Sequence, residues 1–205
     1  MDNKEKIVAG AGELFMRYGV RSVTMDDVAH ELGMSKKTLY QSFTNKDDLV
    51  LEVSKAHIEQ EKREFSSVEA DSANALDELF RITTCARNSL ERVNPSLLFD
   101  LQKYHPSSWE LFLDFKYNVI RAMVERNVTK GITEGYYRKE ISPDVMAKLR
   151  MEQVQMAFDP KIFPSNEYDM VDVQMQVLDH FIHGLLSDKG RELYHTYQQQ
   201  TETTN

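Results

Sequence analysis

Two short helices separated by a tight turn are encoded between Thr24 and Phe43, and their spacing constrains the fold more than any other feature of the sequence. Thr24 and Asp27 match a capping box, in which each side chain accepts a hydrogen bond from the other residue's amide, so a helix begins there. Gly33 suits the left-handed conformation that ends a helix, and Ser35 is a favourable N-cap for the next one. The spacing therefore predicts a helix-turn-helix, in which the second helix enters the major groove of DNA.

The second of these helices has one buried and one exposed side. Ala29 is small enough for two helices to cross closely, and Leu39, six residues after Gly33, returns to the core. The exposed side chains suit DNA: lysines bind phosphates or guanine acceptors, threonine binds a methyl group or phosphate, and glutamine matches the edge of adenine. They are Lys36, Lys37, Thr38, Tyr40 and Gln41. The alternative interpretation is a helical hairpin whose lysines simply face solvent.

Charge is distributed unevenly. The chain has 25 Lys and Arg against 33 Asp and Glu, a formal net charge of -8, which argues against nonspecific binding to polyanions. The stretch from Gly33 to Lys46 nevertheless contains three lysines and no acidic residue. Attraction to a polyanion is therefore expected to be local to this stretch.

Apolar residues recur at helical spacing along almost the whole chain, which predicts an all-α fold. We expect an N-terminal three-helix helix-turn-helix domain over residues 1–50 and a larger helical domain over 51–205, with Gly19 ending the first helix and Asn45 capping the fourth. The polar stretch from Ser66 to Ala75 is the expected joint. The start of the chain has no apolar targeting segment, and no stretch is apolar enough to cross a bilayer, so we expect a cytoplasmic protein with no membrane partner.

Residues 7 to 50 resemble the DNA-binding domain of the TetR family of bacterial transcriptional regulators. The similarity is carried by "LFMRYGVRSVTMDDVAHELGMSKKTLYQSFTNKDDL". The agreeing positions are Gly19, Thr24, Val28, Ala29, Gly33, Ser35, Thr38, Leu39, Tyr40, Phe43, Lys46 and Leu49. Two departures, Lys37 where Gly is usual and Gln41 with Ser42 where His and Tyr often occur, lie on or beside the DNA-facing side, so the operator sequence of relatives does not carry over.

The resemblance implies specific roles. Thr38 and Tyr40 would contact phosphates from the recognition helix, and Lys46 would do so from the start of the fourth helix. The full DNA-binding set that we predict is Thr24, Ser35, Lys36, Lys37, Thr38, Tyr40, Gln41 and Lys46. The family resemblance further implies a homodimer on a palindromic, double-stranded operator, usually acting as a repressor and released by a small-molecule effector.

The later chain resembles the family more weakly, in "VTKGITEGYYRKEISPDV" and "DHFIHGLLSDKGREL". In the second stretch Gly184 is expected to let two helices approach closely. Two amphipathic helices, over 144–158 and 170–186, can build a symmetric four-helix interface between subunits. The interface residues that we predict are Met146, Leu149, Met156, Leu178, Phe181 and Leu185. Closure of the monomer core is the alternative role for the same stripes.

Aromatic and methionine side chains in the middle of the chain suit an adaptable apolar cavity. The pocket residues that we predict are Phe80, Phe99, Trp109, Phe112, Phe115 and Met123. A small apolar or aromatic effector is the expected ligand, although most of these side chains also suit an ordinary core.

Enzymatic and metal-binding functions have little support in the sequence. Glu192 with His195 forms only one of the two Glu-x-x-His pairs that di-iron bundles need. His180 and His183 lie three residues apart, but an interface pair is the simpler interpretation. Cys85 is the only cysteine, and nucleotide-binding and hydrolase motifs are absent. We expect no enzyme, catalytic residue, metal or cofactor; the alternative function is a helical ligand-binding or metal-binding protein with a degenerate DNA domain.

Overall fold

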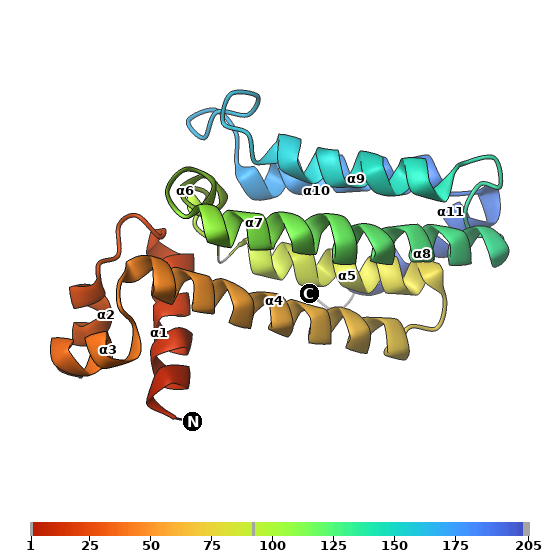
Figure 1. Ribbon diagram of the computed structural model, residues 1–205. Helices are drawn as coiled ribbons and strands as arrows, with labels where there is room; N and C mark the ends of the chain where they lie inside the picture. Colours follow the sequence, from red (N-terminus) through yellow and green to blue (C-terminus); the bar gives the residue numbers. More distant parts are fainter. Residues whose placement is uncertain (1, 92, 203–205) are drawn as a thin grey trace. The chain divides into compact units, whose positions relative to one another are not determined.

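A computed structural model describes residues 2–91 and 93–202 (Figure 1). Helices connected by turns and irregular loops make up the secondary structure of these residues, apart from one isolated bridge between Tyr137 and Leu186, which confirms the predicted all-α fold. The helices are α1 (Asn3–Tyr18), α2 (Met25–Glu31), α3 (Lys36–Ser42), α4 (Lys46–Asp71), α5 (Ala75–Leu90), α6 (Leu97–Tyr104), α7 (Pro106–Asp114), the π-helix η1 (Phe115–Ile120), α8 (Arg121–Thr133), α9 (Pro143–Ala157), α10 (Met170–Leu185) and α11 (Asp188–Glu202).

The chain forms two compact units. The first contains residues 1–63 and 92–115, and the second contains residues 64–91 and 116–205. Helix α4 and the continuous run from α7 through η1 to α8 each contribute to both units. The unit that contains the helix-turn-helix therefore also includes α6 and α7, which follow it by more than 40 residues.

The helix boundaries around the turn arise from the local signals in the sequence. Thr24 and Asp27 form a reciprocal capping box at the start of α2. Gly33 has a φ of +61°, a left-handed conformation that costs glycine little. The Ser35 side chain accepts from the amide of Thr38, and this bond caps α3.

The core of the first unit lies where α1, α2, α3 and the start of α4 meet. Ile7, Phe15, Leu39 and Leu49 are almost fully buried there, and Leu101 of α6 joins the same cluster. Leu39 is the buried residue of α3, and the other side chains of that helix are exposed or half-buried.

The polar stretch Ser66–Ala75 was expected to be a joint, but most of it is helical. Helix α4 continues to Asp71, and only residues 72–74 interrupt the helices before Asn74 caps α5. Ser, Glu, Val and Ala are all tolerated inside a helix, so the polarity of the stretch marked a surface and not a break. The break between α4 and α5 therefore lies within the expected stretch but is only three residues long.

The second unit is built mainly from α5, α8, α9, α10 and α11, with the end of α4 and most of η1. Its core contains Leu76, Leu178, Phe181 and Leu185. The ring of Tyr137 lies so close to Gly131 that any Cβ at this position would overlap it. The Tyr137 hydroxyl donates to the buried side-chain oxygen of Asn127, at 3.0 Å, and burial raises the pKa of Tyr137 well above its usual value.

Gly184 does not bring two helices of this chain together. Apart from its chain neighbours and the backbone of its own helix, no atom of the described residues lies within 4 Å of the position that a Cβ would occupy there. Gly190 of α11 instead allows a close approach to the α8–α9 turn, because a Cβ at this position would overlap the carbonyl oxygen of Tyr136. The expectation for Gly184 was therefore wrong within the single chain, since its open side faces away from the packed helices.

Candidate DNA-binding interface

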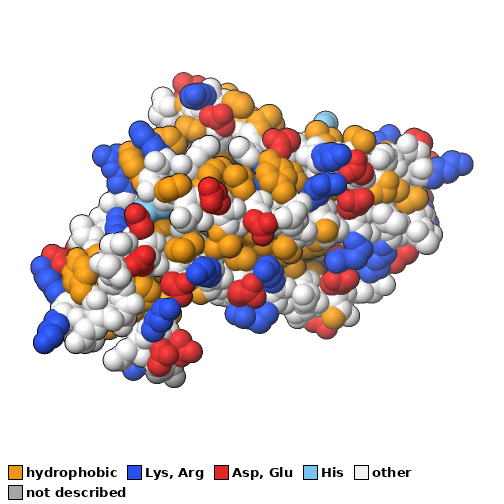
Figure 2. Space-filling model, in the orientation of Figure 1, with side chains coloured by type: hydrophobic (Ala, Val, Ile, Leu, Met, Phe, Trp, Pro, Cys, Tyr) orange, Lys and Arg blue, Asp and Glu red, His pale blue; other side chains and the backbone are white. Residues whose placement is uncertain are grey.

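Helix α3 presents the side chains that the sequence predicted to be exposed. Lys37, Tyr40 and Gln41 are exposed, and Thr38 is half-buried with its hydroxyl 2.8 Å from that of Ser35. Lys37 and Gln41 have no side-chain partner among the described residues, so they are free to bind another molecule. Figure 2 shows Lys and Arg side chains at the edge of the first unit where α2 and α3 lie, with acidic side chains among them.

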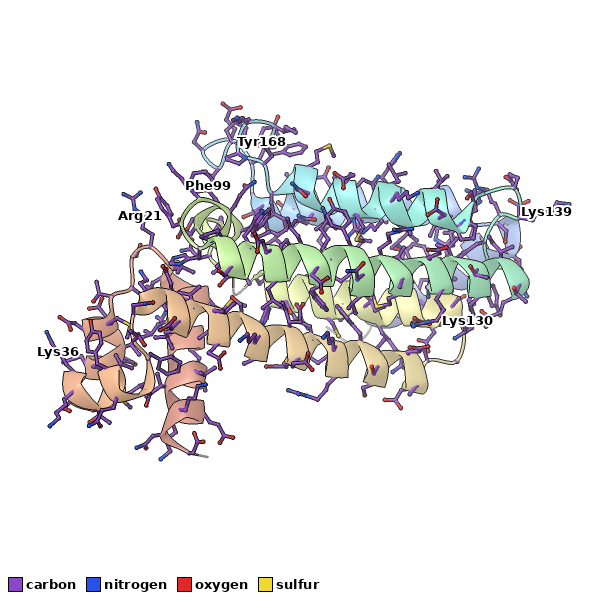
Figure 3. All side chains as sticks on the ribbon, in the orientation of Figure 1. Arg21, Lys36, Phe99, Lys130, Lys139 and Tyr168 are labelled. Atoms are coloured by element: carbon purple, nitrogen blue, oxygen red, sulfur yellow. The ribbon has the colours of Figure 1, made fainter. Side chains whose placement is uncertain are left out.

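Lys36 differs from its neighbour because it is already paired. Its Nζ donates to a carboxylate oxygen of Asp26 in the first turn of α2, and both side chains are largely exposed. The label in Figure 3 marks Lys36 at the outer edge of the helix-turn-helix. An exposed pair of this kind is weak, so a phosphate can replace the carboxylate at little cost.

Lys46 is half-buried at the start of α4. Its Nζ donates to the main-chain carbonyl of Arg21, at 3.5 Å. Burial lowers the pKa of Lys46 from its usual value, while the neighbouring Asp100 and Asp47 act in the opposite direction. Asn45 caps α4 by accepting from the amide of Asp48 at 2.9 Å, so the helix N-terminus adds its own attraction for an anion near Lys46.

Thr24 and Ser35 serve as helix caps. The Thr24 hydroxyl is 2.7 Å from Asp27, and the Thr24 amide donates to the same carboxylate oxygen at 2.8 Å. These two bonds lower the pKa of Asp27 below its usual value. Both caps fix the helix starts that aim α3 outward, and a direct contact of either residue with DNA stays a prediction.

Arg21 is a basic residue of this region that the sequence analysis did not include. Its amide donates to Asp100 of α6 at 3.0 Å, and its guanidinium lies 5.4 Å from the centre of the Tyr104 ring. The local sequence around Arg21 contains no signal for these contacts, because the partners lie about 80 residues further along the chain.

The six predicted pocket residues are divided between the two units. Phe99, Trp109, Phe112 and Phe115 belong to the first unit, where the rings of Trp109 and Phe112 stack 5.3 Å apart. Phe80 and Met123 belong to the second unit. Their grouping around one effector stays a prediction.

Two hollows lie on the second unit, and none of the six predicted pocket residues lines either of them. The larger, about 490 Å³, lies between the α8–α9 turn and the start of α11. The smaller, about 330 Å³, lies along α9 and includes Leu149, Gln153 and Met156.

The six predicted interface residues also fall into two groups. Leu178, Phe181 and Leu185 of α10 are buried in the core of the second unit, and Met146 of α9 is half-buried against it. Leu149 and Met156 of α9 are 45% and 38% exposed. Of these six residues, only Leu149 and Met156 are therefore exposed to a second molecule in the single chain.

The histidines near the end of the chain make local contacts. His183 lies 3.6 Å from Asp179 and packs edge-on against Tyr194. Within the described residues, no three His, Cys, Asp or Glu side chains are grouped so that they could hold a metal ion. No helix among residues 2–91 and 93–202 is both long enough and apolar enough to span a membrane.

Comparison with known proteins agrees with this geometry. Residues 7–53 match the family model of bacterial regulatory proteins of the tetR family. The HTH-type transcriptional regulator YvaF of Bacillus subtilis is 27% identical over 190 residues, which cover 90% of this chain and 96% of YvaF.

Solved structures share the fold over most of the chain. A TetR-family transcriptional regulator from Agrobacterium tumefaciens superposes with a TM-score of 0.73 at 14% identity, covering 90% of this chain and 97% of that one. A transcriptional regulator from Saccharomonospora viridis, solved in complex with choline, gives a TM-score of 0.70 at 20% identity with the same coverage. With its capped helix-turn-helix and its match to the family model over residues 7–53, the chain carries a DNA-binding domain of the TetR family of bacterial transcriptional regulators.

Proposed function

We propose that this protein is a repressor that binds a palindromic operator as a homodimer. The observation that carries the proposal is the exposed side of α3, where Lys37, Tyr40 and Gln41 project from a helix fixed by two caps and the buried Leu39. Phosphate contacts from Lys36, Thr38, Tyr40 and Lys46 would position the helix, and Lys37 and Gln41 would contact base edges. Residues 1–50 would bind DNA, and residues 51–205 would dimerise and respond to an effector. A protein of this function acts on DNA in the cytoplasm.

The proposed dimer forms through α9 and the neighbouring face of α10. Val145, Leu149 and Met156 are 54%, 45% and 38% exposed on the same helix, α9, and a contiguous patch of exposed apolar side chains marks a protein interface. Arg150 Nη1 and Gln153 Oε1, one turn apart on the same helix, are buried without a hydrogen-bond partner among the described residues. Burial lowers the pKa of Arg150 to about 10. Because these atoms are buried within the single chain, a second copy does not reach them, and the proposed interface rests on the exposed side chains of α9.

A two-fold dimer explains how an effector could control binding. Both α3 helices reach one face of the duplex when they lie about 34–36 Å apart. An effector that binds better to a dimer with another separation weakens DNA binding by its difference in affinity for the two states. The effector that we propose is small and apolar or aromatic, in keeping with the Phe and Met side chains in the middle helices. The choline complex of the related fold supports a small organic ligand without identifying this one.

Selection of genomic DNA fragments by the purified full-length protein tests the proposed function. We expect enrichment of a small set of fragments that share a two-fold symmetric sequence, with affinity that falls steeply as salt rises. Retention of all fragments equally, or of none, would contradict operator binding. It would favour a helical ligand-binding or metal-binding protein with a degenerate DNA domain.

A further inference from the structure

The main chain of Arg21 is held at both of its polar atoms. Its amide donates to a carboxylate oxygen of Asp100 at 3.0 Å, and its carbonyl accepts from Lys46 Nζ at 3.5 Å. Asp100 is 4% exposed and also accepts from the Ser96 hydroxyl. The turn between α1 and α2 is therefore fixed against α6 and the start of α4, in the same compact unit.

The side chain of Arg21 is also oriented, but not neutralised. Its guanidinium lies 5.4 Å from the centre of the exposed Tyr104 ring, within the range of a cation–π interaction. The ammonium of Lys103 lies 5.3 Å from the centre of the same ring. Among the described residues, neither cation has an acidic side chain within ion-pair distance, whereas Lys4 pairs with Glu52 and Lys36 with Asp26. Figure 3 shows Arg21 projecting from the α1–α2 turn.

We propose that Arg21 is a DNA phosphate-binding residue and that Tyr104 and Asp100 of α6 are positioning residues for it. This inference rests on the proposed DNA binding. Each strand of duplex DNA carries one phosphate for every 3.4 Å or so of helix rise, so two neighbouring cations can bind successive phosphates. Because Lys46 donates to the carbonyl of Arg21, the two residues are placed to form such a pair. The buried carboxylate of Asp100 fixes the main chain of Arg21, and the Tyr104 ring orients its guanidinium before DNA arrives, which reduces the entropy lost on binding.

The structure offers a matched control for this residue. Arg17 lies on α1 in the same unit, and its guanidinium packs 5.1 Å from the centre of the Tyr18 ring. Arg17 and Arg21 therefore share charge and an aromatic neighbour, but Arg17 has no contact with Lys46. A loss of charge alone affects both variants, whereas a loss of phosphate contact affects only Arg21.

The experiment measures the affinity of the full-length protein for the most enriched genomic duplex and for an unrelated duplex, from 0.05 to 0.3 M salt. Arg21→Gln should lower affinity for both duplexes on the order of 10-fold at 0.15 M salt, and reduce the salt slope by about 0.9 per subunit. Arg21→Lys should keep the slope because it keeps the charge. Arg17→Gln should keep the affinity and the slope of the wild type.

A second set of variants tests the positioning role. Tyr104→Leu should lower affinity several-fold with little change in the salt slope, because the cation remains while its orientation is lost. Tyr104→Phe should restore wild-type affinity because it keeps the aromatic face. If the wild type binds DNA but Arg21→Gln and Arg17→Gln have equal affinities and salt slopes, the proposed phosphate contact of Arg21 is overturned and the proposed DNA binding is not. A wild type that binds neither duplex would instead contradict the proposed DNA binding itself.

Discussion

The imidazole Nδ1 of His105 lies 2.7 Å from a carboxylate oxygen of Asp47, so the junction between α6 and α7 is joined to the first turn of α4. His105 is buried, and Asp47 directly follows Lys46 in the sequence. The bond fixes the segment that carries the predicted phosphate contact. Together with the Asp100 bond to Arg21, it makes α6 part of the support of the helix-turn-helix.

Replacement of His105 by Ala should lower the free energy of unfolding by about 1–3 kcal/mol, because it removes a buried ring and its hydrogen bond. His57→Ala is the matched control, since His57 is exposed on α4 and pairs with Glu61 one turn away. The control should change stability by less than about 0.5 kcal/mol. Urea denaturation followed by circular dichroism measures both, and equal stabilities of the two variants would show that the His105 contact contributes nothing.

The capping box at α2 should make stability depend on acid. Two hydrogen bonds from Thr24 lower the pKa of Asp27, so the folded state favours the ionised carboxylate more than the unfolded state does. The stability that the ionised Asp27 carboxylate contributes is fully present above the ordinary pKa of aspartate. It is lost as the pH falls through the lowered pKa of Asp27 in the folded state. The difference in unfolding free energy between wild type and Asp27→Asn should therefore be larger at pH 7 than at pH 2.5. A difference that is constant or grows toward low pH would contradict this role of the ionised carboxylate.

The second unit contains a buried carboxylate whose cationic partners are partly exposed. Glu78 is almost fully buried, with Arg126 Nη2 at 3.2 Å and Lys130 Nζ at 3.6 Å. Glu78→Gln should cost about 2–3 kcal/mol of stability, less than for a fully buried pair because solvent screens Arg126 and Lys130. Glu69→Gln removes an exposed carboxylate from the same Arg126 and should cost less than about 0.5 kcal/mol. Thermal unfolding of the two variants measures these losses of stability. If Glu69→Gln destabilises the protein as much as Glu78→Gln does, burial of Glu78 is not the cause of its larger contribution.

The dimer proposal separates two groups of residues that the sequence analysis placed in one interface. Leu149→Glu with Met156→Glu should give a folded monomer in sedimentation experiments, because both side chains are exposed on α9. Phe181→Asp should unfold the second unit, since truncation of a buried Phe alone costs about 3–5 kcal/mol. If the α9 double variant remains a dimer with the dissociation constant of the wild type, the proposed interface is wrong.

Local features of the helix-turn-helix could be predicted from sequence because each depends on residues a few positions apart. The capping box from Thr24 to Asp27, the Ser35 cap and the left-handed Gly33 are of this kind. The contacts of Asp47 with His105 and of Arg21 with Asp100 join residues 58 and 79 positions apart, and periodicity does not encode such pairs. Periodicity also identified the apolar stripes of α9 and α10 without showing that Phe181 is in the core and Leu149 on the surface.

The most direct test of the central claim, that α3 docks on DNA, is the affinity of a Lys37→Ala, Tyr40→Ala double variant for the most enriched genomic duplex over a salt series. We expect a loss of about 2–4 kcal/mol in binding free energy per dimer and a smaller salt slope, with circular dichroism and sedimentation unchanged. Lys55→Ala, which removes an exposed lysine paired with Glu52 on α4, should bind as the wild type does. A folded, wild-type-like double variant that binds the duplex as tightly as Lys55→Ala would contradict the account, because the exposed side of α3 would then make no contact with DNA.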